Sequence, residues 1–105
     1  MISLAVLAAA LLLPAAASAS INWTGHSYHL NGGQSGYTNY KVTLQYSAVY
    51  STEALGCAGI RYIEGVACMT VTHQYAAVKN PTRVVSEPYI HNHSTFPAYF
   101  EGFYE

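Results

Sequence analysis

Histidine is the side chain of this sequence best suited to chemistry, because imidazole nitrogens bind transition metals and exchange protons near neutral pH. The five histidines include two close pairs, His91-x-His93 and His26-x-x-His29. Alternate residues of a β-strand project from one face, so His91 and His93 can present two imidazoles to one ion, and His73 or the other pair can supply a third. The competing interpretation places these rings on solvated loops or edge strands. Because the chain contains no Asp that could orient them, we favour the second interpretation and expect no cofactor.

The two cysteines, Cys57 and Cys68, are the second reactive pair. In an oxidising compartment they are expected to form one disulfide, which closes a loop of about twelve residues and contributes roughly 3 kcal/mol. Direct cross-strand pairing would centre the turn on residues 62–63, whereas the turn chemistry lies at residues 64–65. We therefore expect a bulge or a loop at Cys57. Metal ligation and free thiols are the alternatives, and no C-x-x-C redox motif occurs.

Carboxylates are too few to indicate catalysis. They number five: Glu53, Glu64, Glu87, Glu101 and Glu105. A catalytic triad needs one of them to orient a histidine, and the sequence contains no G-x-S-x-G, H-E-x-x-H or phosphate-binding glycine loop. A glycosidase pair could be built from Glu87 and Glu101, but edge carboxylates that aid solubility are the simpler interpretation. We expect that the protein is not an enzyme.

Aromatic side chains are abundant, with ten Tyr, three Phe and one Trp. Tyrosine offers a large contact area at low entropic cost and stacks on sugar faces, so a Tyr-rich surface favours a binding function. The predicted binding patch comprises the C-terminal aromatic residues and the single tryptophan: Trp23, Tyr89, Tyr99, Phe100, Phe103 and Tyr104. The alternative is that these rings form the core of a small domain.

The N-terminus determines where these residues are expected to act. Residues 2–13 are apolar apart from Ser3, and Pro14 and the small-residue run that ends at Ala19 follow them. This pattern predicts a secretory signal peptide, residues 1–19, cleaved before Ser20. A retained membrane anchor is the alternative, but the apolar run is shorter than a bilayer span. The expected product is a single secreted, extracellular domain of residues 20–105, with no membrane span after cleavage.

The sequence pattern predicts β-strands in the rest of the chain. Residues 40–51 alternate between two faces, which predicts a long half-buried strand. The other predicted elements are a hairpin of residues 60–63 and 66–75, a turn at residues 79–82, a strand at residues 83–93 and a closing aromatic segment at residues 96–104. No segment carries a helical period over more than two turns. The fold class is therefore all-β, a small antiparallel sandwich or barrel-like meander of about five to six strands.

Charge and composition limit the classes of function that the sequence supports. Four basic and five acidic side chains leave no electrostatic footprint for nucleic acid or an anionic membrane. The leading hypothesis is a secreted non-catalytic domain whose Tyr-rich surface binds an extracellular protein, a glycan or a cell envelope. A bacteriocin-like or toxin-like antimicrobial protein and an exported metal-binding protein are the alternatives. Asn22 and Asn92 begin N-glycosylation sequons, which are meaningful only in a eukaryotic source.

Overall fold

The computed structural model describes residues 24–105, and within that range the chain forms strands and no helix. The predicted signal peptide and Trp23 lie outside the described residues. The eight strands are β1 Thr24–Leu30, β2 Ser35–Tyr37, β3 Val42–Tyr50, β4 Gly56–Ile60, β5 Val66–Cys68, β6 Tyr75–Ser86, β7 Pro88–Asn92 and β8 Ala98–Tyr104. In this described part of the chain, no helix is available to span a membrane.

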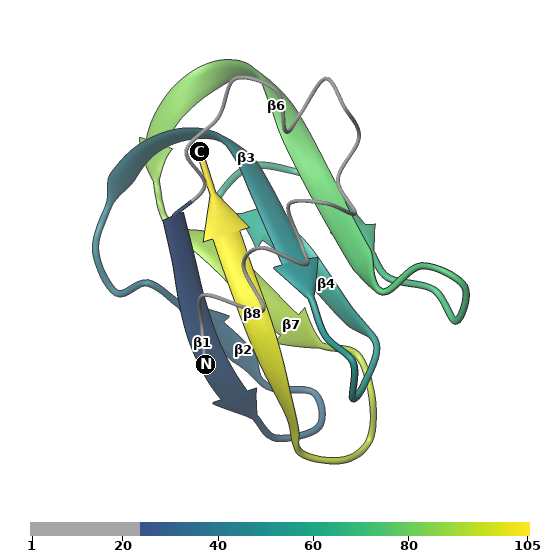
Figure 1. Ribbon diagram of the computed structural model, residues 1–105. Helices are drawn as coiled ribbons and strands as arrows, with labels where there is room; N and C mark the ends of the chain where they lie inside the picture. The colour runs from purple at the N-terminus through teal and green to yellow at the C-terminus, as the bar shows by residue number, and fades with distance from the viewer. Residues whose placement is uncertain (1–23) are drawn as a thin grey trace.

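Two antiparallel sheets of four strands pack face to face (Figure 1). Sheet A has the order β1-β8-β3-β6, and sheet B has the order β2-β7-β4-β5. The pairs β1–β8, β2–β7, β3–β6 and β4–β5 match the first half of the chain with the second half in reverse, as in one long folded hairpin. This is the strand order of a jelly roll. The predicted all-β sandwich with one disulfide is confirmed. The structure has eight strands where about five to six were predicted, and two of them, β2 and β5, are only three residues long.

The core lies between the sheets and is built largely from residues of β3, β4 and β8. Its largest fully buried side chains include Phe100, Leu44, Ile60 and Val49. Close packing depends on a glycine opposite a large ring: a Cβ on Gly56 would lie 2.6 Å from the Phe100 ring. Small residues on one sheet therefore leave room for aromatic rings on the other, which lets a short chain bury a continuous apolar layer.

The strand predicted at residues 40–51 is present as β3, but its strict alternation is wrong in the second half. Leu44 is fully buried, and the consecutive residues 47–49 are buried as well. The cause is an irregularity in the β3–β6 ladder, where Leu44 pairs with Val84 but Tyr46 pairs with Lys79. Residues 80–83 therefore bulge opposite Gln45, and the bulge changes which β3 residues face the core.

The turn predicted at residues 79–82 is this bulge within β6 rather than a break between strands. The Gln45 side-chain amide donates hydrogen bonds to the carbonyls of Asn80 (2.9 Å) and Pro81 (3.1 Å). The backbone amides of Gln45 and Tyr46 donate to the Glu105 carbonyl. Proline cannot donate to the ladder, and β6 is an edge strand of sheet A, so the bulge also interrupts an edge that could pair with another chain.

The hairpin around the cysteines differs from the prediction. Cys57 and Cys68 are direct cross-strand partners, so no bulge or extra loop is needed at Cys57. The turn is centred on residues 62–63, and Tyr62 adopts the left-handed conformation there, with φ 67°. Gly65 also has positive φ, as its turn chemistry indicated. The second arm ends at Cys68 instead of continuing to Tyr75, because residues 69–74 form a loop.

Tyr28 connects the core to a testable dependence on pH. Its ring packs against Gly36 of sheet B and Gly102 of sheet A, and burial raises the pKa of its hydroxyl to about 12, with smaller contributions from Tyr40, Glu87 and Tyr104. Above the ordinary tyrosine pKa the unfolded chain loses this proton more readily than the folded protein does. The free energy of unfolding is therefore expected to fall between about pH 10 and pH 12.

The measurement is urea denaturation across that range with the natural protein and Tyr28→Phe. The variant lacks the titrating hydroxyl, so its stability should depend less steeply on pH. Identical pH profiles for the two proteins would show that Tyr28 ionises in the folded state as readily as in the unfolded one.

Candidate functional site

The outer face of sheet B gathers the residues best suited to bind a ligand. Ile90 of β7 and Ala58 of β4 belong to the core, so their chain neighbours project outward. The antiparallel register aligns these outward residues in two adjacent rows across the sheet. The first row is Tyr37, Tyr89, Gly59 and Val66, and the second is Ser35, His91, Cys57 and Cys68.

All of these residues except Gly59, which lies beneath the Tyr89 ring, line a shallow hollow of about 550 Å³, within the range of small-molecule sites. Arg61 and Tyr62 border it at the β4–β5 turn, and His93 borders it just beyond the end of β7. None of the described residues that line it is an aspartate or a glutamate. The hollow is therefore a surface of aromatic rings, hydroxyls, imidazoles and one guanidinium, together with Val66 and the disulfide.

Gly59 determines how the central ring lies. The Tyr89 ring crosses directly over this glycine, where a Cβ would stand 2.4 Å from the phenol oxygen. Tyr37 packs beside Tyr89 with ring centroids 5.4 Å apart and planes tilted by 38°. Burial raises the pKa of the Tyr89 hydroxyl, and Tyr37 adds to the shift. The Tyr89 hydroxyl therefore stays protonated at neutral pH and can both donate and accept hydrogen bonds.

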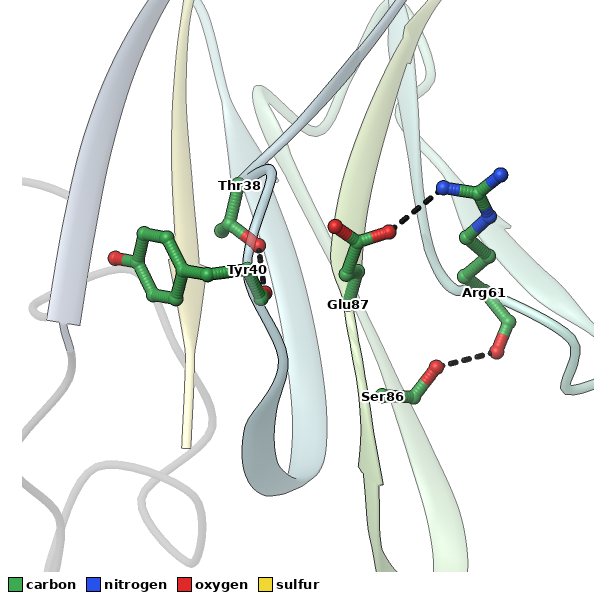
Figure 2. Close-up of polar contacts among 5 residues, drawn as sticks. All are labelled: Thr38, Tyr40, Arg61, Ser86 and Glu87. Atoms are coloured by element: carbon green, nitrogen blue, oxygen red, sulfur yellow. Dashed lines mark hydrogen bonds and ion pairs between the residues drawn. The ribbon is translucent and has the colours of Figure 1, made fainter.

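Arg61 is held in a defined place by Glu87 and Ser86, as Figure 2 shows. Its guanidinium bonds to the Glu87 carboxylate at 2.7 Å, and its backbone amide donates to the Glu87 carbonyl at 2.9 Å. The Ser86 hydroxyl donates to the Arg61 carbonyl at 2.7 Å. The guanidinium carbon lies 4.8 Å from the Tyr37 ring centroid and 5.1 Å from that of Tyr62. The Glu87 hydrogen bond raises the pKa of Arg61 further, so the cation is permanent but already paired.

The two histidines of the hollow differ in their surroundings. His91 Nδ1 shares a hydrogen bond of 2.9 Å with the Ser35 hydroxyl, which fixes the ring against the neighbouring strand. His93 is exposed, and its backbone amide donates to the Leu55 carbonyl. The two ring centroids are 6.3 Å apart. The H-x-H spacing thus brings both imidazoles to one hollow.

The third predicted metal ligand lies elsewhere. His73 is in the loop after β5, where its Nδ1 lies within hydrogen-bond distance of the hydroxyls of Thr70 and Thr72. Among residues 24–105, no three His, Cys, Asp or Glu side chains are grouped to hold a metal ion. Within these residues, His91 and His93 therefore lie near each other without a third side chain that could complete a metal site.

The predicted aromatic patch is divided among different parts of the fold. Tyr89 lies in the hollow on sheet B. Tyr99 projects from the outer face of sheet A and stacks on His29 with centroids 4.3 Å apart, and Phe103 is buried with Ala48. Tyr104 stacks on His26 with centroids 5.9 Å apart. Phe100 is core, as the alternative interpretation of the aromatic load expected.

The two glutamates considered for glycoside cleavage lie on different segments of the chain and have different partners. Glu87 bonds to Arg61 beside sheet B. Glu101 lies on sheet A and accepts a hydrogen bond from Ser27 at 3.0 Å. Burial raises the pKa of Glu101, and the Ser27 hydrogen bond opposes that shift.

Asn92, the described sequon residue, has a structural role. Its side chain is fully buried, and its amide donates to the carbonyls of Leu30 (3.0 Å) and Phe96 (2.9 Å). Its Oδ1 accepts from the backbone amide and the hydroxyl of Ser94. The folded protein therefore offers no accessible amide for a glycan at Asn92. Asn22 lies outside the described residues.

The sequence patterns missed most of the hollow. Ser35 and Tyr37 lie in a Gly-rich segment whose composition is typical of a loop. Gly59 has no side chain that could indicate a binding role. Arg61 is one of only four basic residues in the sequence. Tyr62, which follows it, lies in the β4–β5 turn and is 85% exposed. These residues come together only because strands that are distant in sequence pair with one another. No single segment of the sequence indicates that pairing.

The fold and the hollow together define a disulfide-linked jelly-roll sandwich with a hollowed, aromatic and polar surface on one sheet. Comparison with protein-family models, with curated proteins and with solved structures finds no match to this chain. The function must therefore be argued from the site itself.

Proposed function

We propose that this protein is an exported, non-catalytic binding domain whose outer face of sheet B binds a saccharide. The observation that carries the proposal is the Tyr89 ring, which lies across Gly59 and faces the hollow. A pyranose ring has an apolar C–H face that stacks on an aromatic ring, and hydroxyls around its edge that need hydrogen-bond partners. The hollow offers both kinds of contact.

The groups around Tyr89 fit the edge of a sugar. Ser35 and His91 lie in the adjacent row, and Tyr37 flanks the ring. These side chains supply hydroxyl and imidazole groups that donate and accept hydrogen bonds. The Arg61 charge is neutralised by Glu87, so the surface favours an uncharged ligand over a strongly anionic one.

Export is part of the proposal. A disulfide is typical of proteins that fold in an oxidising compartment. The apolar N-terminal segment with small residues up to Ala19 is typical of a secretory signal peptide. A saccharide-binding domain outside the cytosol would meet glycans of an envelope or of the surrounding medium.

The first test is binding of the protein to an array of neutral and acidic oligosaccharides, followed by calorimetry with the best ligand. Tyr89→Ala is expected to lower the affinity about tenfold, because it removes a stacking contact of roughly 1.5 kcal/mol. The matched control is Tyr99→Ala on the outer face of sheet A, which is 61% exposed and should leave the affinity unchanged.

Two results would contradict this function. Either no oligosaccharide binds the folded protein, or binding survives Tyr89→Ala and is lost with Tyr99→Ala. The second result would place the ligand on the His29–Tyr99 stack of sheet A.

A further inference from the structure

A second pocket opens at the end of the sandwich, where three loops meet. It has a volume of about 480 Å³ and lies among residues 51–55, 69–74 and 93–96. Figure 1 shows the β3–β4 and β7–β8 loops together at the lower end of the molecule. Loops that connect strands at one end of a β-sandwich are common positions for ligand contacts.

The floor of this pocket is continuous with the core. Met69 is buried in the main core cluster, and Ala54 and Leu55 pack against that cluster. At the rim, Val71 is 88% exposed and Phe96 is 50% exposed. Large apolar side chains that surround an open pocket are typical of a site that gains stability when it is covered.

The polar groups of the pocket disfavour a strongly charged occupant. Its described lining contains no lysine or arginine. The one carboxylate, Glu53, already accepts a hydrogen bond of 2.8 Å from the Tyr99 backbone amide. An anion would find no lysine or arginine there, and an ammonium group would have to compete with an existing bond. An uncharged apolar group meets neither obstacle.

The walls are fixed before any ligand arrives. The Ser51 hydroxyl donates to the Tyr99 carbonyl at 2.7 Å and accepts from the backbone amides of Glu53 and Ala54. The His93 amide bonds to the Leu55 carbonyl at 3.0 Å. A preformed pocket binds without the entropic cost of ordering its loops.

His93 joins this pocket to the hollow on sheet B, because it lines both. A single ligand can therefore lie across His93 and occupy the two sites. We infer that the pocket takes an uncharged alkyl or aryl group carried by the saccharide ligand. The ligand class is then a glycoside with an apolar substituent, and this inference rests on the proposed saccharide-binding function.

The test is calorimetry with methyl, butyl and hexyl β-D-glucopyranoside below their micellar concentrations, and with hexan-1-ol alone. Each methylene that is fully buried should raise the affinity about fourfold. Hexyl glucoside is expected to bind at least tenfold more tightly than methyl glucoside, and hexan-1-ol should bind at one site.

Two variants locate the apolar group. Thr52→Trp places a large ring at the pocket and should abolish both the gain with chain length and the binding of hexan-1-ol, whereas Thr82→Trp, at an exposed position on β6, should change neither. Val71→Asp puts a charge at the rim without touching the core and should weaken hexyl glucoside more than methyl glucoside. Tyr89→Ala should weaken both glucosides equally and leave hexan-1-ol unchanged.

The outcomes separate the two proposals. Equal affinities for methyl and hexyl glucoside, with no binding of hexan-1-ol, would overturn the pocket inference and leave saccharide binding standing. Hexan-1-ol binding that survives Thr52→Trp would also overturn it. If Thr52→Trp removes hexan-1-ol binding while no glucoside or array saccharide binds, the pocket binds apolar groups, but the saccharide function is wrong and the inferred glycoside ligand is overturned with it.

Discussion

Asn92→Ala is expected to lower the free energy of unfolding by about 3 kcal/mol, because it leaves several buried polar groups without partners. The natural side chain joins the end of β1 at Leu30 to the β7–β8 loop at Phe96 and Ser94. Its backbone also bonds to residues 33 and 34 in the β1–β2 loop. One residue thus fastens two loops to the end of the sandwich.

Urea denaturation of the variant measures this loss as a lower midpoint at an unchanged slope. Asn31→Ala is the matched control, because Asn31 is exposed and its change should stay within about 0.5 kcal/mol. Asn92→Asp keeps the acceptor for Ser94 but loses the donor to the two carbonyls, so it should be nearly as unstable as the alanine variant. A loss below about 1 kcal/mol for Asn92→Ala would show that the buried network contributes little.

Replacing both cysteines by alanine is expected to lower the free energy of unfolding by about 3 kcal/mol, since the disulfide restricts the unfolded chain over a loop of about twelve residues. The bridge directly joins the paired residues of β4 and β5, and Cys57 is buried. β5 is three residues long and forms the edge of sheet B, so few other bonds hold it.

Denaturation of the double variant gives the size of the effect, and hydrogen exchange gives its place. Faster exchange should be confined to β5 and its flanking loops, while β3 and β8 keep their protection. The natural protein measured under reducing conditions is the control and should match the variant. If the variant is as stable as the oxidised protein, the disulfide is not a main support of this fold.

The jelly-roll order could not be predicted from local sequence, although the β class could. The alternation in β3 revealed a strand, but the bulge opposite Gln45 depends on β6 and on the carbonyl of Glu105, which are distant in sequence. β4 is a further example, since its sequence GCAGI shows no alternation and all five residues are buried. It is buried because Gly56 and Gly59 accommodate the rings of Phe100 and Tyr89, which lie at least thirty residues away.

Part of the candidate site could be predicted from the sequence. The H-x-H spacing predicts that the rings of His91 and His93 lie near each other, and their centroids are 6.3 Å apart although His93 lies just beyond the end of β7. The abundance of tyrosine predicts a Tyr-rich surface, and Tyr37, Tyr62 and Tyr89 line the hollow. Which tyrosines share a surface depends on strand pairing. Tyr37 and Tyr89 meet because β2 pairs with β7, while Tyr99 lies on the other sheet. The alternation of residues along a strand predicts which face of that strand a residue lies on. The order in which the strands pair determines which residues of different strands share one surface of the protein.

The most direct test of saccharide binding at sheet B is a map of the ligand on the folded protein. Two-dimensional NMR of the isotope-labelled protein would be followed during titration with the oligosaccharide that binds best on the array. We expect the shifts to concentrate in Tyr37, Gly59, Tyr89 and His91, with none in Tyr99. Shifts centred on Tyr99 and His29, with the sheet B signals unmoved, would contradict the account and place the binding surface on sheet A.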